Sequence, residues 1–109
     1  MVRILVNKAD ERILKDIAQD LDGYIKVVVD IKRSILAAGG TRHVLSEELL
    51  LKDGSQQADL WGAGLDLETG GIDFDSMINI RPGQNNPSRE ILDKDIRDKV
   101  TDVIMRILK

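Results

Sequence analysis

Hydrophobic residues recur at helical spacing near both ends of the chain. Near the start, apolar positions three or four residues apart form one stripe and predict a helix over residues 9–21. This stripe consists of Ile13, Leu14, Ile17, Ala18 and Leu21. A longer stripe predicts a second helix over residues 94–108, with Asp93 as its N-cap. It consists of Ile96, Val100, Val103, Ile104, Ile107 and Leu108.

The pattern between these helices is that of strands. Residues 24–31 contain three consecutive valines, and such a continuous apolar run indicates a strand near the middle of a sheet, covered on both faces. A second apolar run covers residues 34–38. Lys32 and Arg33 between the two runs are not turn formers, so the runs form either a hairpin or one bent strand.

Residues 46–52 are ambiguous. Ser46 as an N-cap and Gly54 as a stop favour a short helix. The three consecutive leucines from Leu49 to Leu51 would also suit a strand. We expect the short helix and keep the strand as the alternative.

The clearest supersecondary prediction is a hairpin with arms over residues 59–67 and 72–81. Its tight connection at residues 68–71 contains two glycines. In the second arm apolar residues alternate with polar ones, which predicts one buried face and one exposed face. The apolar face holds Ile72, Phe74, Ile78 and Ile80 and is interrupted by Ser76.

Trp61, in the first arm, is the only tryptophan and is followed by Gly62 and Gly64. Glycines in a strand mark a bulge or let a ligand or another segment of the chain approach closely. In an otherwise aliphatic domain, one large aromatic side chain is usually needed in the core. We therefore expect Trp61 inside the core, with the glycines making room for packing.

The order of these elements predicts an α+β fold in a single globular domain over residues 1–109. We expect a sheet of four or five strands with the hairpin at its centre. The helices over residues 9–21 and 94–108 are expected to pack on one face of that sheet. A chain of 109 residues has room for one core and not for a second.

Composition narrows the functional classes. With 16 basic and 19 acidic residues, the chain lacks the basic excess that is typical of nucleic-acid-binding proteins, so nucleic acid is a disfavoured partner. The absence of cysteine excludes disulfides, thiolate metal sites and cysteine nucleophiles. The first residues lack the apolar core of a signal peptide and no run reaches membrane-spanning length, so we expect a soluble, cytoplasmic protein without a membrane partner.

Residues 39–43 are the first candidate for chemistry. Gly39 and Gly40 precede Arg42 and the only histidine, His43, so this loop could form a backbone nest for an anion beside a proton-transferring side chain. A lone histidine is more often a packing or surface residue, and two glycines equally suit a sharp turn with positive φ. The Gly-Lys-Ser/Thr pattern of a P-loop is absent.

The second candidate lies at the end of the predicted hairpin. Asn79 and Arg81 project from its polar face, and an arginine fork beside an amide could hold a carboxylate or a phosphate group. Arg81 could equally tie down the following loop through backbone carbonyls. With Asp59 from the other arm, the candidate ligand- or anion-binding set is Gly39, Gly40, Arg42, His43, Asp59, Asn79 and Arg81.

We assign no catalytic residue, no metal site and no cofactor. Asp73 and Asp75 would lie on one face of a strand, close enough to share a cation. With 19 acidic residues in the chain such pairs arise by chance, and an exposed strand face explains this one.

Several strings in the second part of the chain together carry a family resemblance. They are Val29-Asp30, Ile35 to Gly40, His43, Asp53 to Gln56, Asp59 to Ala63, Ile78 to Pro82, Ser88, Glu90-Ile91, Asp93 and Ile96-Arg97. In these strings the chain resembles a small prokaryotic family that is catalogued only as a domain of unknown function. The resemblance implies a recurrent fold and supplies no activity.

Two functional hypotheses follow. In the first, the protein is a non-enzymatic binding or regulatory module that engages a protein partner or a sister subunit through the hairpin face and residues 82–88. In the second, it is a small hydrolase or a nucleotide- or anion-binding enzyme with its site around residues 39–43 and Arg81. A small anionic ligand fits the second hypothesis.

Overall fold

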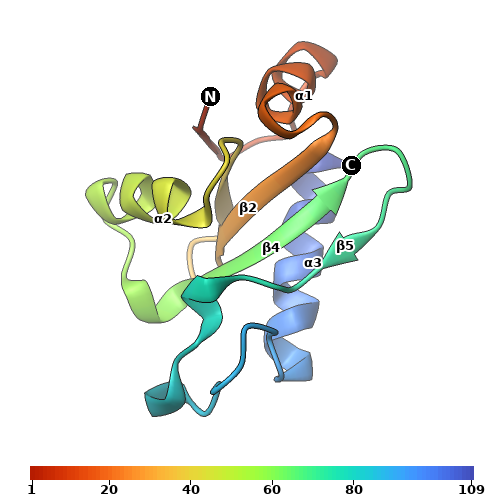
Figure 1. The fold of residues 1–109 in the computed structure, drawn as a ribbon. Coiled ribbons are helices and arrows are strands. Elements are labelled where there is room, and N and C mark those ends of the chain that lie inside the picture. Colours follow the sequence, from red (N-terminus) through yellow and green to blue (C-terminus); the bar gives the residue numbers. More distant parts are fainter.

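The computed structural model describes all residues from 1 to 109 and contains one five-stranded antiparallel sheet with three helices (Figure 1). The strand order across the sheet is β1-β3-β2-β4-β5. The strands are β1 (Arg3–Leu5), β2 (Tyr24–Asp30), β3 (Ile35–Ala38), β4 (Leu60–Asp66) and β5 (Ile72–Asp73). The helices are α1 (Glu11–Ala18), α2 (His43–Lys52) and α3 (Lys94–Leu108). The predicted α+β fold is confirmed.

Strand β2 lies at the centre of the sheet, between β3 and β4. Its three valines are fully buried, as the continuous apolar run predicted. A tight turn joins β2 to β3, because the Asp30 carboxylate accepts hydrogen bonds of 2.9 Å from the backbone N–H groups of Lys32 and Arg33. Ser34 completes the turn with a φ of 55°. The hairpin alternative is therefore confirmed, and Asp30 supplies the turn chemistry that Lys32 and Arg33 lack.

The two faces of the sheet are covered by different helices. Helices α1 and α3 pack on one face, where Ile17, Trp61 and Ile104 belong to the larger hydrophobic cluster. Trp61 is 1% exposed, so its predicted place in the core is confirmed. Helix α2 packs on the opposite face, where Leu50 contributes to a smaller cluster with residues of β2, β3 and β4. None of the three helices is long and apolar enough to cross a membrane.

Helix α2 begins three residues earlier than predicted. The expected N-cap, Ser46, lies inside the helix and is fully buried, while Arg42 occupies the N-cap position without a side-chain hydrogen bond. The side chains that α2 turns inward are mostly polar. They are those of His43, Ser46, Glu47 and Leu50. Because the buried side chains in the first turn of α2 are polar, this turn shows no apolar periodicity. The start of α2 therefore could not be predicted from the sequence.

The predicted hairpin is only partly present. Strand β5 contains two residues instead of ten, and it lies at the edge of the sheet instead of the centre. Beyond Asp73 the chain leaves the sheet and forms the 3-10 turn η3 (Met77–Asn79). Ser76 caps this turn, because its hydroxyl accepts a hydrogen bond of 3.3 Å from the N–H of Ile78. The predicted strand face is therefore wrong, and the serine that interrupts its apolar side marks the break.

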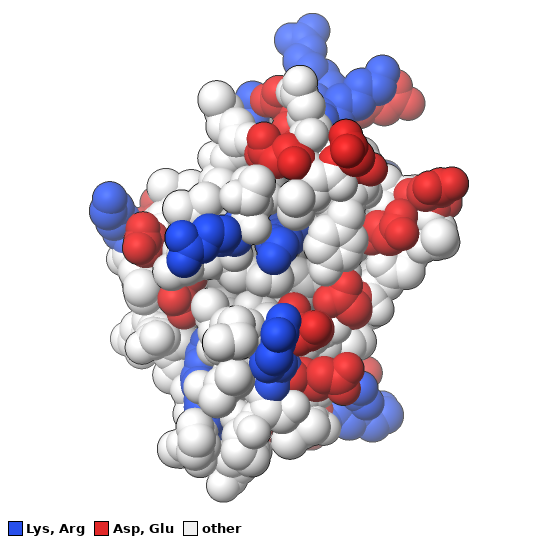
Figure 2. Space-filling view, in the orientation of Figure 1, with Lys and Arg blue, Asp and Glu red and all other residues white.

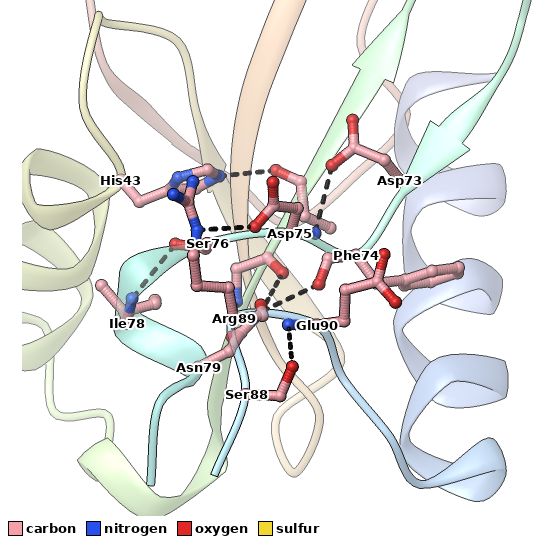
Figure 3. Close-up of polar contacts among 12 residues, drawn as sticks. His43, Asp73, Phe74, Asp75, Ser76, Ile78, Asn79, Ser88, Arg89 and Glu90 are labelled. Carbon is pink, nitrogen blue, oxygen red and sulfur yellow. Dashed lines mark hydrogen bonds and ion pairs between the residues drawn. The ribbon is translucent and has the colours of Figure 1, made fainter. Parts of the chain in front are cut away.

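Residues 74–92 form one long loop that is held in place by two buried asparagines, Asn79 and Asn86, the first of which is labelled in Figure 3. The carboxamide of Asn79 accepts from Gly62 N (2.8 Å) and donates to the carbonyls of Gly62 (2.9 Å), Phe74 (3.1 Å) and Arg89 (3.0 Å). Asn86 repeats this arrangement inside the loop. It donates to the carbonyls of Asn79, Ser88 and Glu90 and accepts from the N–H of Leu92. Side-chain amides thus replace the sheet ladder as partners for this backbone.

The loop lies close against β4 because a glycine is present at the contact. A Cβ atom on Gly62 would stand 2.5 Å from the Cβ atom of Ser76. Any larger residue at position 62 would push the loop away from the sheet. The expectation that this glycine provides packing room is confirmed, with the loop as the element that uses it.

Candidate functional site

A cleft with a volume of about 330 Å³ opens between the N-terminus of α2, the start of β2 and the loop after β5. Ten residues line it. They are Tyr24, Lys26, Arg42, His43, Val44, Asp75, Ser76, Met77, Ile78 and Arg89. On the face drawn in Figure 2, basic side chains lie toward α2 and the centre, while acidic side chains gather toward β5.

The floor of the cleft follows from the alternation of side chains along β2. Tyr24 and Lys26 are two residues apart, so they share a face with Val28, which packs in the core beneath α2. Helix α2 covers the Val28 end of this face and leaves the Tyr24 end open. The loop after β5 then closes the opposite side of the opening.

Gly64 lets the ring of Tyr24 cross β4. A Cβ atom at position 64 would stand 1.8 Å from the Tyr24 hydroxyl oxygen, so only glycine fits there. The hydroxyl donates a hydrogen bond of 2.7 Å to the carboxylate of Asp73. Burial, together with this bond and the charge of Asp73, raises the pKa of Tyr24 above its ordinary value. Tyr24 is therefore a neutral, fixed wall of the cleft.

His43 is the only titratable side chain of the cleft that is nearly enclosed, with 8% of its surface exposed. Its Nε2 atom lies 2.7 Å from the carbonyl oxygen of Ala63. Because a carbonyl can only accept, Nε2 carries the proton and Nδ1 carries the lone pair in the neutral ring. Burial lowers the pKa of His43 below its ordinary value, so the imidazole is neutral at pH 7.

The cleft has an excess of positive charge. Its lining contains the cations Lys26, Arg42 and Arg89 and a single carboxylate, Asp75. Arg89 is paired with Asp75 through a contact of 2.9 Å between Nε and Oδ1. Lys26 and Arg42 have no such partner, since neither takes part in an ion pair or a side-chain hydrogen bond. The lining thus carries two net positive charges in a chain whose own net charge is −3.

The N-terminus of α2 adds to this positive potential. Arg42, His43 and Val44 all line the cleft, and no side chain caps the first N–H groups of the helix. The partial positive charge of a helix N-terminus favours anions within the first turn. The helix dipole and the two unpaired cations therefore act in the same direction.

The structure brings two of the seven predicted site residues to the cleft, Arg42 and His43. Gly39 and Gly40 lie outside it and form a turn, with φ values of 104° and 73°. The N–H of Gly40 donates to the carboxylate of Asp20 (3.0 Å), which is bound in turn by the amino terminus. The backbone of the glycine pair thus packs against the start of the chain.

Arg81 ties backbone segments together, which is the alternative that the sequence left open. Its Nε donates to the carbonyl of Ile78 (2.9 Å), and its two terminal nitrogens reach the carbonyls of Gln57 (2.8 Å) and Leu60. The guanidinium lies 4.6 Å from the centroid of the Trp61 ring. Burial lowers the pKa of Arg81 from its ordinary value. All three of its nitrogens are therefore occupied by the protein itself.

The last two predicted residues also lie outside the cleft. Asn79 is fully buried beneath the loop and has its carboxamide occupied by backbone groups. Asp59 ends the 3-10 turn η2 (Gln57–Asp59), and its carbonyl accepts a hydrogen bond of 3.1 Å from the N–H of Ile31. Asn79 and Arg81 hold the loop that forms one wall, so they support the cleft without lining it.

Sequence reasoning missed most of the lining. Tyr24 and Lys26 had a usable signal, because two polar-tipped residues at strand spacing precede the valines and mark an uncovered end of the face. The pairing of Asp75 with Arg89 left no signal in the sequence, because 14 residues separate them and only the folded loop brings them together. No three His, Asp or Glu side chains of the structure gather in a way that could hold a metal ion.

Comparison with known proteins places the chain without describing its activity. A family model described as "Protein of unknown function (DUF5674)" matches residues 3–107. No curated protein and no solved structure matches the chain.

Proposed function

We propose that this chain, which belongs to the DUF5674 family, is a binding module for a small anionic ligand and that the ligand occupies the His43 cleft. One observation carries the proposal. Lys26 and Arg42 line the cleft without an ion-pair partner, beside a helix N-terminus that no side chain caps. The cleft therefore concentrates positive charge that the protein does not neutralise.

Charge-assisted hydrogen bonds would supply the binding energy. A hydrogen bond to a charged group contributes about 1.5–3 kcal/mol, and more when the site excludes water. A carboxylate or phosphate group can accept from Lys26, Arg42 and the first N–H groups of α2 at once. The volume of about 330 Å³ lies at the small end of ligand sites, which favours a compact metabolite over a large cofactor.

The structure of residues 72–81 is the reason why we favour a small ligand over a protein partner. The protein-partner hypothesis relied on the hairpin face and on residues 82–88, and the second arm of that hairpin, residues 72–81, is largely a loop. Engagement of a protein partner or a sister subunit stays a prediction that analytical ultracentrifugation can test. The cytoplasmic location stays a prediction as well.

The hydrolase hypothesis has one observation in its favour. His43 is neutral with a free Nδ1, as a general base requires, and Ser76 lines the same cleft. A phosphorus NMR time course with p-nitrophenyl phosphate and the protein at equal concentrations tests it. Release of inorganic phosphate that requires His43 would replace the binding-module proposal with this one.

The binding proposal is tested with a small panel of anions: inorganic phosphate, sn-glycerol 3-phosphate, succinate and L-malate. A ligand at 100 times its Kd adds about 2.7 kcal/mol to the free energy of unfolding, which a thermal-shift assay detects easily. Isothermal titration calorimetry then gives the affinity. We expect at least one anion to bind.

The matched variants are Lys26→Met and Lys32→Met, because neither lysine side chain has a partner and only Lys26 lines the cleft. Lys26→Met should weaken binding about tenfold, whereas Lys32→Met should leave it unchanged, since one lost charged contact is worth about 1.4 kcal/mol or more. If no anion binds, or if the two variants bind equally well, the proposal is wrong.

A further inference from the structure

The tautomer of His43 specifies what the cleft can offer to a ligand. The bond of 2.7 Å from Nε2 to the carbonyl of Ala63 fixes the proton on Nε2. Nδ1 is then a hydrogen-bond acceptor. It is not one of the fully enclosed atoms that lack a partner, so some of its surface is exposed, and the imidazole itself lines the cleft.

No protein group supplies a donor to this acceptor. The Tyr24 hydroxyl is used by Asp73. The Nε of Arg89 is used by Asp75 (Figure 3). The Ser76 hydroxyl accepts from the N–H of Ile78 and makes no hydrogen bond with the imidazole, whose one bond is that to the Ala63 carbonyl. Nδ1 has no hydrogen-bond partner of its own within the chain. An unpaired acceptor on a nearly enclosed imidazole therefore belongs to a cleft whose lining carries an excess of positive charge.

We infer that the ligand is a hydroxylated small anion, whose anionic group contacts Lys26 and Arg42 and whose hydroxyl donates a hydrogen bond to Nδ1 of His43. This inference rests on the proposed function and adds the chemical class of the ligand. Hydroxy-carboxylates and polyol phosphates both belong to that class. A buried polar group left unpaired is costly, so a site with such an acceptor discriminates against an anion that lacks the hydroxyl.

The charges around His43 are consistent with a neutral imidazole in this role. Lys26 from β2, Arg42 from α2 and Arg89 from the loop line the cleft with it, and Asp73 and Asp75 face it from the β5 side. Burial and Lys26 lower the pKa of His43, while the Ala63 carbonyl and the two aspartates act in the opposite direction. Protonation of Nδ1 would remove the acceptor, so binding of a hydroxylated anion should weaken as the imidazole becomes charged.

Two matched ligand pairs test the inference by calorimetry. They are sn-glycerol 3-phosphate with n-propyl phosphate, and L-malate with succinate. In whichever pair binds, we expect the hydroxylated member to bind about fivefold more tightly, because one neutral hydrogen bond is worth on the order of 1 kcal/mol. Lowering the pH from 7.5 to 5.5 should reduce this preference.

The informative variant is His43→Gln. The glutamine amide can still donate to the Ala63 carbonyl, but it places no acceptor where Nδ1 stands. We expect the preference for the hydroxylated member to fall to less than twofold. Nitrogen-15 NMR of the wild-type imidazole does not depend on how the variant folds: the Nδ1 signal should shift with the hydroxylated ligand more than with its partner.

The possible failures are distinguishable. If neither member of either pair binds, the proposed function is wrong. If both members bind equally, or if binding tightens as His43 becomes protonated, the anion site stands and the inferred hydroxyl contact is wrong. The second outcome would mean that an imidazolium contacts the anion directly.

Discussion

Asn79 should be the polar side chain on which the wall of the cleft depends most. It is fully buried, and its carboxamide satisfies one N–H and three carbonyl groups that belong to β4 and to the two ends of the loop. Asn79→Ala would leave the N–H and the carbonyl of Gly62 without a partner, whereas the carbonyls of Phe74 and Arg89 would keep the backbone bonds that they accept from Ile91 and Ser76. Asn79→Asp would place a buried carboxylate against three carbonyl oxygens.

The expected loss of free energy of unfolding follows from the number of backbone groups that lose their hydrogen-bond partner. An unsatisfied buried backbone group costs about 1–3 kcal/mol, and two such groups, the N–H and the carbonyl of Gly62, lose their partner in Asn79→Ala. We therefore expect Asn79→Ala to lower the free energy of unfolding by about 3–5 kcal/mol. Such a loss is a large fraction of the ~5–15 kcal/mol of a typical domain. Asn79→Asp should lose at least as much at pH 7.

Urea denaturation measures this effect, with the fluorescence of the buried Trp61 as the signal. The matched control is Asn7→Ala, because Asn7 is exposed and its side chain makes no hydrogen bond. The control should stay within about 0.5 kcal/mol of the wild type. A loss below about 1 kcal/mol in Asn79→Ala would refute the idea that this side chain holds the loop.

Two further predictions concern the cleft itself. Gly64→Ala should lower the free energy of unfolding by about 1–3 kcal/mol, because its Cβ would displace the Tyr24 hydroxyl and the ring carbon Cζ that carries it. In the Tyr24→Ala background the penalty should shrink, and an equal penalty in both backgrounds would contradict the explanation. The depressed pKa of His43 means that the unfolded chain binds a proton more readily than the folded chain does. Stability should therefore fall as the pH decreases from about 6.5 toward the folded-state pKa, and urea titrations of His43→Gln should show a smaller fall over that window.

The parts of the fold that the sequence predicts are those whose signal is local. The stripe that includes Val100 and Ile104 repeats at helical spacing and becomes the core face of α3, with Asp93 as its N-cap. The three valines of β2 are continuous because that strand is covered on both faces. In each case the residues that define the element are also the residues that bury it.

The parts that the sequence misses depend on contacts between distant residues. Ile78 and Ile80 alternate like a strand, yet the chain turns at Ser76 because Asn79 finds backbone partners in β4 and near Arg89. The start of α2 is hidden for a related reason, since its inward side chains are mostly polar, and that of His43 takes its partner, the Ala63 carbonyl, from β4. Periodicity cannot report such partners, because it measures only spacing along the chain.

The candidate site shows the same division. Arg42 and His43 could be chosen from the sequence because a lone histidine beside two glycines is locally unusual. Arg81 drew attention for the same reason, and the structure uses its guanidinium to bind backbone carbonyls and Trp61. Unusual residues thus marked both the cleft and the structure that supports it, and only the fold separates the two.

The most direct test of the anion-binding cleft is a nitrogen-15 NMR titration of the protein with inorganic phosphate and, separately, with succinate. The proposal predicts saturable amide shifts at His43 and Val44, at Lys26 and at Asp75 to Ile78, and a much weaker response in Lys26→Met. The control segment is α1, which packs on the opposite face of the sheet. Saturable shifts confined to α1, or no saturable shift with either anion, would contradict the account.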